Sequence, residues 1–246
     1  APAHPPPLTP TETSMRLHRL SLLLLLFPAL PVSANLDVHP MRVHLDAGRT
    51  TSIRVQAQSP RTQYVRATVK RVVAPATEDE SEVDEPPGDA AAIAVTPGMF
   101  ALAGGGSRLV RVIALAPVSE ETAFRVYFEG VRGDDPDARP DALETPGATL
   151  GVSLVWGVLV NVLPADGRVA MQVAGDRLHN HGTLRLGIRR VEHCVAAACT
   201  THDIERSVYP GATLALPFEP MAGARLRVDY RLSRDGYREH QQILLP

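Results

Sequence analysis

The sequence predicts an all-β protein made of two tandem immunoglobulin-like β-sandwiches. Short segments that alternate apolar and polar residues, or are rich in β-branched and aromatic residues, recur at spacings of about ten residues. Turn residues such as Gly, Pro, Asp and Ser separate these segments, and none shows a convincing amphipathic helical period. Strands that follow one another without helical crossovers favour antiparallel sandwiches.

Length and charge limit the class of protein. The chain has 246 residues, enough for one large domain or two small ones. Its 25 basic and 27 acidic residues nearly balance, and aromatic residues are few, which argues against a nucleic-acid partner. Lys70 is the only lysine, so nearly every cation is an arginine.

Residues 1–34 are expected to lie outside the folded domains. Basic residues follow Met15, an apolar run covers residues 20–30, and small residues stand at Val32 and Ala34. This order predicts a signal peptide that starts at Met15 and is cleaved after Ala34, and the proline-rich stretch before Met15 either lies upstream of the true start or is a disordered extension. The apolar run is short for a membrane span, so an uncleaved anchor is the less favoured alternative.

The first domain is predicted over residues 35–164. Its expected strands are residues 41–45, 51–57, 64–73, 108–115 and 124–131. Two acidic, proline-containing stretches, residues 78–89 and 132–147, interrupt this pattern and are expected to be solvated loops.

The last segment of this domain, GATLGVSLVWGVLVNVLP at residues 147–164, has two patterns. Its first half alternates, with Leu150, Val152 and Leu154 on one face, whereas its second half is apolar on both faces. We expect the second half to enter the core of its own domain. The first half either covers the same sandwich or is an edge presented to another protein.

The second domain is predicted over residues 165–246, after the break PADG. Its expected strands are VAMQVAG, TLRLGIRRVEH, TLALPF and RLRVDYRLS. These segments suit a second, smaller sandwich.

One cluster in the second domain contains metal-ligand residue types. His193, Cys194, Cys199 and His202 could be written as a zinc site, but all four lie within ten residues. In an exported protein, two cysteines that flank the turn VAAA are better explained as a disulfide closing a hairpin. We therefore predict a Cys194–Cys199 disulfide and no metal site.

No catalytic constellation is found. HNH at residues 179–181 is interpreted as a polar turn before a strand. AGGGS at residues 103–107 lacks the lysine and helix of a phosphate loop and is interpreted as a turn, and no serine stands in a G-x-S-x-G setting. The prediction is a protein that is not an enzyme and has no cofactor, with an exported hydrolase as a weaker alternative.

The ordered features resemble a known family. VTPGMFALAGGGSRLVRV (95–112), FRVYFEGV (124–131), an acidic loop and a strand ending in NVLP resemble the first domain of PapD-like periplasmic pilus chaperones of the chaperone/usher pathway. NHGTLRLGIRRVEHC (180–194), with its short Cys-to-Cys gap, and YPGATLALPF (209–218) are similar to the chaperones of the common pilus type.

The resemblance implies a function for the alternating segment. Pilus subunits of this pathway are immunoglobulin-like folds that lack their last strand, and the chaperone lends one of its own by edge-to-edge pairing. The lending residues would be Leu150, Val152 and Leu154, with Ala148 as a shallow first plug. The implied partners are pilin subunits and an outer-membrane usher in the periplasm, without nucleotide. Self-capping as a dimer is left open.

The resemblance also implies an anchor for the C-terminal carboxylate of the pilin. Arg42 matches the family's arginine, and a guanidinium fork suits a carboxylate. The family's lysine is missing, and Gly157 stands at its expected place. Arg111 and Arg125 are interpreted as structural residues near the domain junction. A surface role for Arg42, and a structural or adhesive pilus component as the function, remain the alternatives.

Overall fold

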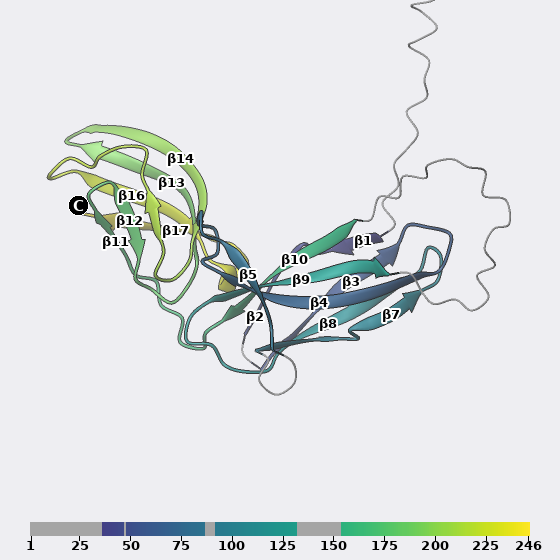
Figure 1. The fold of residues 1–246 in the computed structure, drawn as a ribbon. Coiled ribbons are helices and arrows are strands. Elements are labelled where there is room, and N and C mark those ends of the chain that lie inside the picture. The colour runs from purple at the N-terminus through teal and green to yellow at the C-terminus, as the bar shows by residue number, and fades with distance from the viewer. Residues whose placement is uncertain (1–35, 47, 87–91, 132–153) are drawn as a thin grey trace, which may run out of the picture. The chain divides into compact units, whose positions relative to one another are not determined.

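The computed structural model describes residues 36–46, 48–86, 92–131 and 154–246. These residues form two β-sandwiches in tandem, which confirms the predicted fold class (Figure 1). Within the described part of the chain, no helix has the length and apolar character needed to cross a membrane.

The first sandwich consists of two sheets. One has the strand order β1-β3-β8-β6, and the other has the order β2-β10-β9-β4-β5, with β7 also pairing with β4. The bounds are β1 Leu36–His39, β2 Arg42–Asp46, β3 Thr50–Ala57, β4 Gln63–Val73, β5 Ser81–Asp84, β6 Ile93–Thr96, β7 Met99–Leu102, β8 Ser107–Ala114, β9 Thr122–Val131 and β10 Val155–Leu163. β2 runs parallel to β10, whereas the other pairs are antiparallel.

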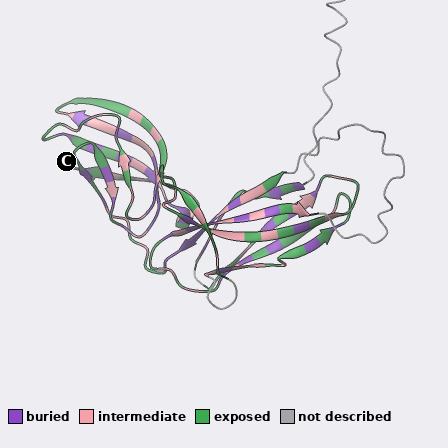
Figure 2. Cartoon of the chain, viewed as in Figure 1, coloured by how far each residue is buried: buried purple, intermediate pink, exposed green. Residues whose placement is uncertain are grey.

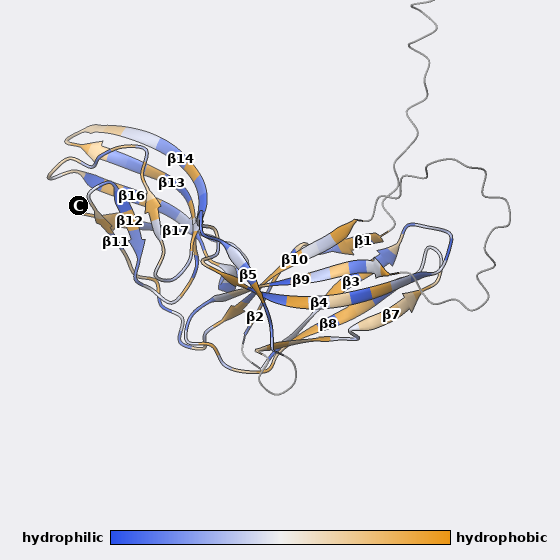
Figure 3. Ribbon diagram, in the orientation of Figure 1, coloured by the Kyte–Doolittle hydropathy of each residue, from blue (hydrophilic) through white to orange (hydrophobic). Residues whose placement is uncertain are grey.

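The core of the first sandwich follows from the alternation of its strands (Figures 2 and 3). Residues of β3, β8 and β9 that point inward are fully buried, among them Ile53, Val110, Phe124 and Phe128. Burial of each such side chain contributes about 1.5–3 kcal/mol, so the alternating pattern fixes which face of each strand lies inside.

The acidic stretch at residues 78–89 contains a strand that the sequence pattern did not predict. Ser81–Asp84 form β5, which pairs with the end of β4. The Tyr127 hydroxyl lies 2.7 and 2.9 Å from the two carboxylate oxygens of Glu82 and donates its one proton to that carboxylate, and Glu80 accepts a hydrogen bond from Arg125 at 3.1 Å. The expectation of a loop was wrong here because the strand is held by charged contacts at the sheet edge, which leave no apolar alternation to detect.

Arg125 and Arg111 were both interpreted as structural residues. Arg125 forms ion pairs with Glu80 and Glu82 of the same sandwich, which agrees with a structural role. Arg111 is exposed on β8, opposite Ser52 of β3.

The second sandwich also consists of two sheets, with orders β11-β12-β15 and β14-β13-β16-β17. The bounds are β11 Met171–Ala174, β12 Arg177–Asn180, β13 Leu186–Val195, β14 Ala198–Val208, β15 Thr213–Ala215, β16 Arg225–Arg231 and β17 Glu239–Leu244, with the 3-10 turn η3 at Ser233–Asp235. Its core is separate from the first and includes Leu178, Leu186, Ile188 and Leu226.

The predicted disulfide is present. Cys194 and Cys199 are paired across the β13–β14 hairpin and are bonded to each other. Because the two sulfur atoms are joined, neither is a thiolate able to bind zinc. The rings of His193 and His202 stack against Phe218, with centroid distances of 4.8 and 4.4 Å.

The HNH stretch contains a buried polar residue of the second sandwich, Asn180. Asn180 ends β12, and its side-chain amide donates to the carbonyl oxygens of Leu184 at 2.8 Å and Val208 at 2.9 Å. Its Oδ1 accepts from the backbone N–H of Gly182 at 2.9 Å. The prediction of a turn holds after residue 180, whereas Asn180 itself joins three segments of the sandwich.

A buried polar contact joins residues of the two sandwiches. Glu121, just before β9, accepts hydrogen bonds from the backbone N–H of Arg185 at 2.9 Å and from the Ser233 hydroxyl at 2.7 Å. The Arg185 Nε atom lies 3.8 Å from the same carboxylate. Desolvation by burial raises the pKa of Glu121 above its usual 4.5.

A second contact lies beside it. The Tyr209 hydroxyl donates to Asn161 Oδ1 of β10 at 2.9 Å, within a small apolar cluster that includes Val72 and Ala123. Burial raises the pKa of Tyr209 to about 12, so its hydroxyl stays protonated as a donor at neutral pH.

Asn180→Ala tests the polar centre of the second sandwich. The substitution removes three hydrogen bonds and leaves two buried carbonyls with fewer partners, so we expect the free energy of unfolding to fall by about 2–3 kcal/mol in urea denaturation. Arg177→Ala, at an exposed position of the same strand, is the control and should change it by less than about 0.5 kcal/mol. Equal effects of the two substitutions would contradict this account.

Glu121→Gln tests the buried carboxylate through the pH dependence of stability. Because the pKa of Glu121 is raised by folding, its contribution is fully present below the unfolded pKa and is lost as pH rises through the folded pKa. Glutamine stays neutral, so between pH 4 and 8 the wild-type melting temperature should fall relative to that of the variant. The exposed Glu219→Gln is the control and should run parallel to the wild type. Parallel curves for Glu121→Gln as well would refute the raised pKa.

Candidate functional site

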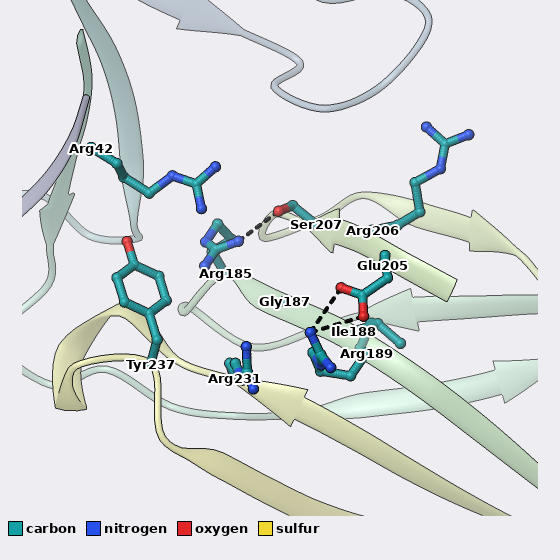
Figure 4. Close-up of a pocket in the computed structure, with 10 residues that line it drawn as sticks. All are labelled: Arg42, Arg185, Gly187, Ile188, Arg189, Glu205, Arg206, Ser207, Arg231 and Tyr237. Atoms are coloured by element: carbon teal, nitrogen blue, oxygen red, sulfur yellow. Dashed lines mark hydrogen bonds and ion pairs between the residues drawn. The ribbon is translucent and has the colours of Figure 1, made fainter. Parts of the chain in front are cut away.

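A basic pocket lies where Arg42 of β2 approaches the second sandwich (Figure 4). Its volume is about 290 Å³, and its lining includes Arg42, Arg185, Arg189, Arg206 and Arg231, with Glu205 as the only carboxylate among the lining residues. The lining therefore carries more guanidinium groups than carboxylates, which is an arrangement suited to an anion.

The five arginines differ in how they are neutralised. Arg189 pairs with Glu205 at 2.8 Å, and Arg231 pairs with Glu239 at 2.6 Å. Arg42 and Arg206 have no carboxylate within 4 Å among the described residues. The side chain of Arg206 points away from the others, so Arg42 is the unpaired cation that faces the pocket (Figure 4).

Arg185 is held rigidly at the bottom of the pocket. Its side chain is 4% exposed, and its Nε donates to the Ser233 hydroxyl at 3.3 Å while Nη1 donates to the Ser207 hydroxyl. The ring of Tyr237 covers its guanidinium, with 5.7 Å between Cζ and the ring centroid. Among the described residues, the carboxylate paired with it is that of Glu121.

Tyr237 is held in an unusual backbone conformation. It follows η3 with φ at 64°, and Gly236 before it has φ at 76°, a region that a residue with a side chain seldom adopts. The ring lies edge-on to His44 of β2 at 6.0 Å. Its hydroxyl is shielded from solvent without a hydrogen-bond partner in the described part of the chain, and it points toward the side chain of Arg42 (Figure 4).

β10 positions Arg42. β2 runs parallel to β10 with Arg42 opposite Leu159, and the Leu159 N–H donates to the Met41 carbonyl at 3.0 Å. The residue chosen from the sequence therefore lies in the basic pocket. Its proposed role as a carboxylate anchor stays a prediction.

Gly157 supplies no cation to the pocket, and the space where a side chain would start is filled by side chains of the neighbouring strand. A β-carbon there would lie 2.9 Å from Cε1 of Tyr127 and 3.1 Å from Cδ of Arg125, which are side chains of the neighbouring strand β9. A lysine at this position would have to displace the contacts that Tyr127 and Arg125 make with β5.

The predicted strand donor lies mostly outside the described residues. This applies to Ala148, Leu150 and Val152, whereas Leu154 stands directly before β10 and is 46% exposed. The next residue, Val155, is 50% exposed.

The second half of the segment enters the core as predicted. Val158, Val160 and Val162 are fully buried in the first sandwich, and Trp156 packs partly against the same core. On the other face of β10, Leu159 packs against the apolar cluster with Tyr209. The continuous apolar run therefore reflects burial on two faces, one by the strand's own sandwich and one at the junction.

Two residues of the pocket were not singled out by the sequence analysis. Arg185 lies in the quoted stretch NHGTLRLGIRRVEHC without any feature that separates it from the other arginines. Tyr237 follows a glycine in the stretch RDGYREH, which is a turn signal but carries no functional information.

Comparison with protein-family models gives no match. Among curated proteins, the chain is 31% identical over 211 residues to a CS1 fimbrial subunit of Escherichia coli, covering 81% of this chain and 86% of that protein. It is 26% identical over 206 residues to a CFA/I fimbrial subunit of the same species, covering 79% of this chain and 85% of that protein.

Solved structures show the same fold. The class 5 fimbriae chaperone CfaA aligns over 86% of this chain and its own full length with a TM-score of 0.70 and 24% identity. A chain of the Salmonella enterica SafA pilin–SafB chaperone complex aligns over 88% of this chain and 99% of its own length, with a TM-score of 0.53 and 17% identity.

The likeness to common-pilus chaperones in particular stays a prediction. The broader resemblance agrees with the curated relatives, which are fimbrial proteins, and with the two-sandwich fold of the solved chaperones. The chain belongs to the family of PapD-like periplasmic pilus chaperones of the chaperone/usher pathway.

Proposed function

We propose that this protein binds pilus subunits in the periplasm by lending them a β-strand and delivers them to an outer-membrane usher. The observation that carries the proposal is the change of burial along one segment. Val158, Val160 and Val162 are fully buried, whereas Leu154 and Val155 shortly before them are half exposed. An apolar strand that leaves its own core in this way offers an edge and a row of side chains to a client.

The proposed lending residues are Ala148, Leu150, Val152 and Leu154. They share one face of the segment because successive strand residues point to opposite sides. Each large aliphatic side chain that becomes fully buried in a client contributes about 1.5–3 kcal/mol, and ladder hydrogen bonds add to this. Among the similar structures, the SafA pilin–SafB chaperone complex pairs a pilin with a chaperone.

Arg42 is proposed to bind the C-terminal carboxylate of the client. It is exposed, faces the basic pocket and has no carboxylate partner within 4 Å among the described residues. A guanidinium can donate two parallel hydrogen bonds to a carboxylate, which fixes the end of the client strand and thus its register.

The remaining parts of the proposal concern the cellular route. Residues 15–34 would act as the export signal and be removed by cleavage after Ala34. Transfer to the usher would need no nucleotide or other cofactor, because a better-fitting strand from the next pilin replaces the lent one. No catalytic role is proposed.

A structural pilus component is the second candidate. The curated relatives are named as fimbrial subunits, which favours it. The two candidates differ in where the protein is found: a pilus component is recovered in sheared pili, whereas a chaperone stays in the periplasmic fraction.

Aspartate substitutions test the lent strand. We expect Val152→Asp and Leu154→Asp each to abolish co-purification of a coexpressed pilin, because each buries a carboxylate in the apolar groove of the client. Pull-down from periplasmic extract measures this. Leu109→Asp, which changes an exposed leucine of β8, is the matched control and should retain the pilin. If both variants still protect the pilin from degradation, strand lending is wrong.

A further inference from the structure

We propose that Arg185 and Tyr237 of the second sandwich complete, with Arg42, a clamp for the C-terminal carboxylate of the client. This inference rests on the proposed function and adds two binding residues to it. In this clamp the two sandwiches supply one cation each, and Tyr237 adds a neutral donor.

The ion pairs around the pocket favour Arg42 and Arg185 as ligands for an anion over the other three arginines that line it. Arg189 and Arg231 are already paired with exposed carboxylates, at 2.8 and 2.6 Å. Arg206 lines the pocket but points away from Arg42 (Figure 4). Arg42 has no carboxylate partner among the described residues, Arg185 is paired with the buried Glu121, and the two side chains lie close together at the pocket (Figure 4).

Arg185 has donors left for a ligand. Its Nε and Nη1 are directed at Ser233 and Ser207, and Glu121 lies on the Nε side. The remaining nitrogen, Nη2, makes no hydrogen bond within the described residues, and Arg185 lines the pocket. A donor already fixed by three neighbours loses little side-chain entropy when an anion binds.

Tyr237 provides a hydroxyl that is also free to donate a hydrogen bond. Its Oη atom has no hydrogen-bond partner in the described part of the chain, which is uncommon for a shielded polar atom. Tyr237 has a left-handed φ of 64°, a conformation that clusters at functional sites, and its hydroxyl is on the side of the Arg42 side chain (Figure 4). Arg42 is exposed, so its guanidinium can move to admit a carboxylate between itself and Tyr237.

The ligand is a chain-terminal carboxylate and not an acidic side chain. The pocket is bordered by Arg42, which begins β2, and β2 pairs with β10, the strand that continues from the proposed lending residues. A client strand that pairs with the segment before β10 can thus end at the pocket, where only its terminal group would enter.

The test uses a synthetic peptide that copies the last strand of the co-purifying pilin, prepared as the free acid and as the C-terminal amide. Isothermal titration gives the ratio of the two dissociation constants for each variant. The wild type should bind the acid at least about tenfold more tightly than the amide. Tyr237→Phe, which keeps the ring over Arg185, and Arg185→Gln should each reduce this preference by about tenfold.

Arg206→Gln is the matched control. It removes the same charge from the same pocket, but its side chain points away from the clamp, so the preference for the acid should change by less than about twofold. Thermal melts show whether Arg185→Gln still folds, and Tyr237→Phe keeps the test valid if it does not.

The outcomes separate the clamp from the proposed function. If Tyr237→Phe and a folded Arg185→Gln keep the wild-type preference while Arg42→Gln loses it, the second sandwich provides no anchor and this inference is overturned. If the wild type binds acid and amide equally, the clamp is also wrong, although strand lending stands. If no pilin co-purifies with the wild type, the proposed function fails and the clamp fails with it.

Discussion

The buried carboxylate of Glu121 is the interaction on which the arrangement of the pocket depends. It is fully enclosed, and it accepts hydrogen bonds from a backbone N–H and a hydroxyl of the second sandwich. A carboxylate in such a place is costly to desolvate, and the Arg185 guanidinium nearby offsets part of that cost. The same contact fixes the backbone and side chain of Arg185, so the residue that holds the junction also shapes the floor of the basic pocket.

β10 links this junction to the proposed binding edge. One face of the strand is part of the first core, through Val158, Val160 and Val162, and the other carries Leu159 and Asn161 to Tyr209. A strand held on both faces is a rigid base for the residues that precede it. The segment that would pair with a client therefore continues from one of the best-anchored strands, and Arg42 lies directly beside that strand.

The sequence predicted the fold class well because most strands alternate between apolar and polar residues. Among the strands it missed are β5, β14 and β17, whose residues are mainly charged or polar and whose partners are other side chains or the sheet edge. The disulfide was predictable because both cysteines flank one short turn. Arg42 was found through family resemblance alone. Arg185 and Tyr237 were not predictable, since they are far from Arg42 in sequence and reach the pocket through the junction contact and a left-handed turn.

The near absence of lysine has a practical consequence for labelling. Lys70 is the only lysine, and it lies on β4 with its ammonium group 3.5 Å from the carboxylate of Asp84 on β5. Amine-reactive dyes and crosslinkers would attach to a single side chain besides the α-amino group, at a position that does not line the basic pocket. Such a label would leave unmodified all the guanidinium groups proposed to bind the client.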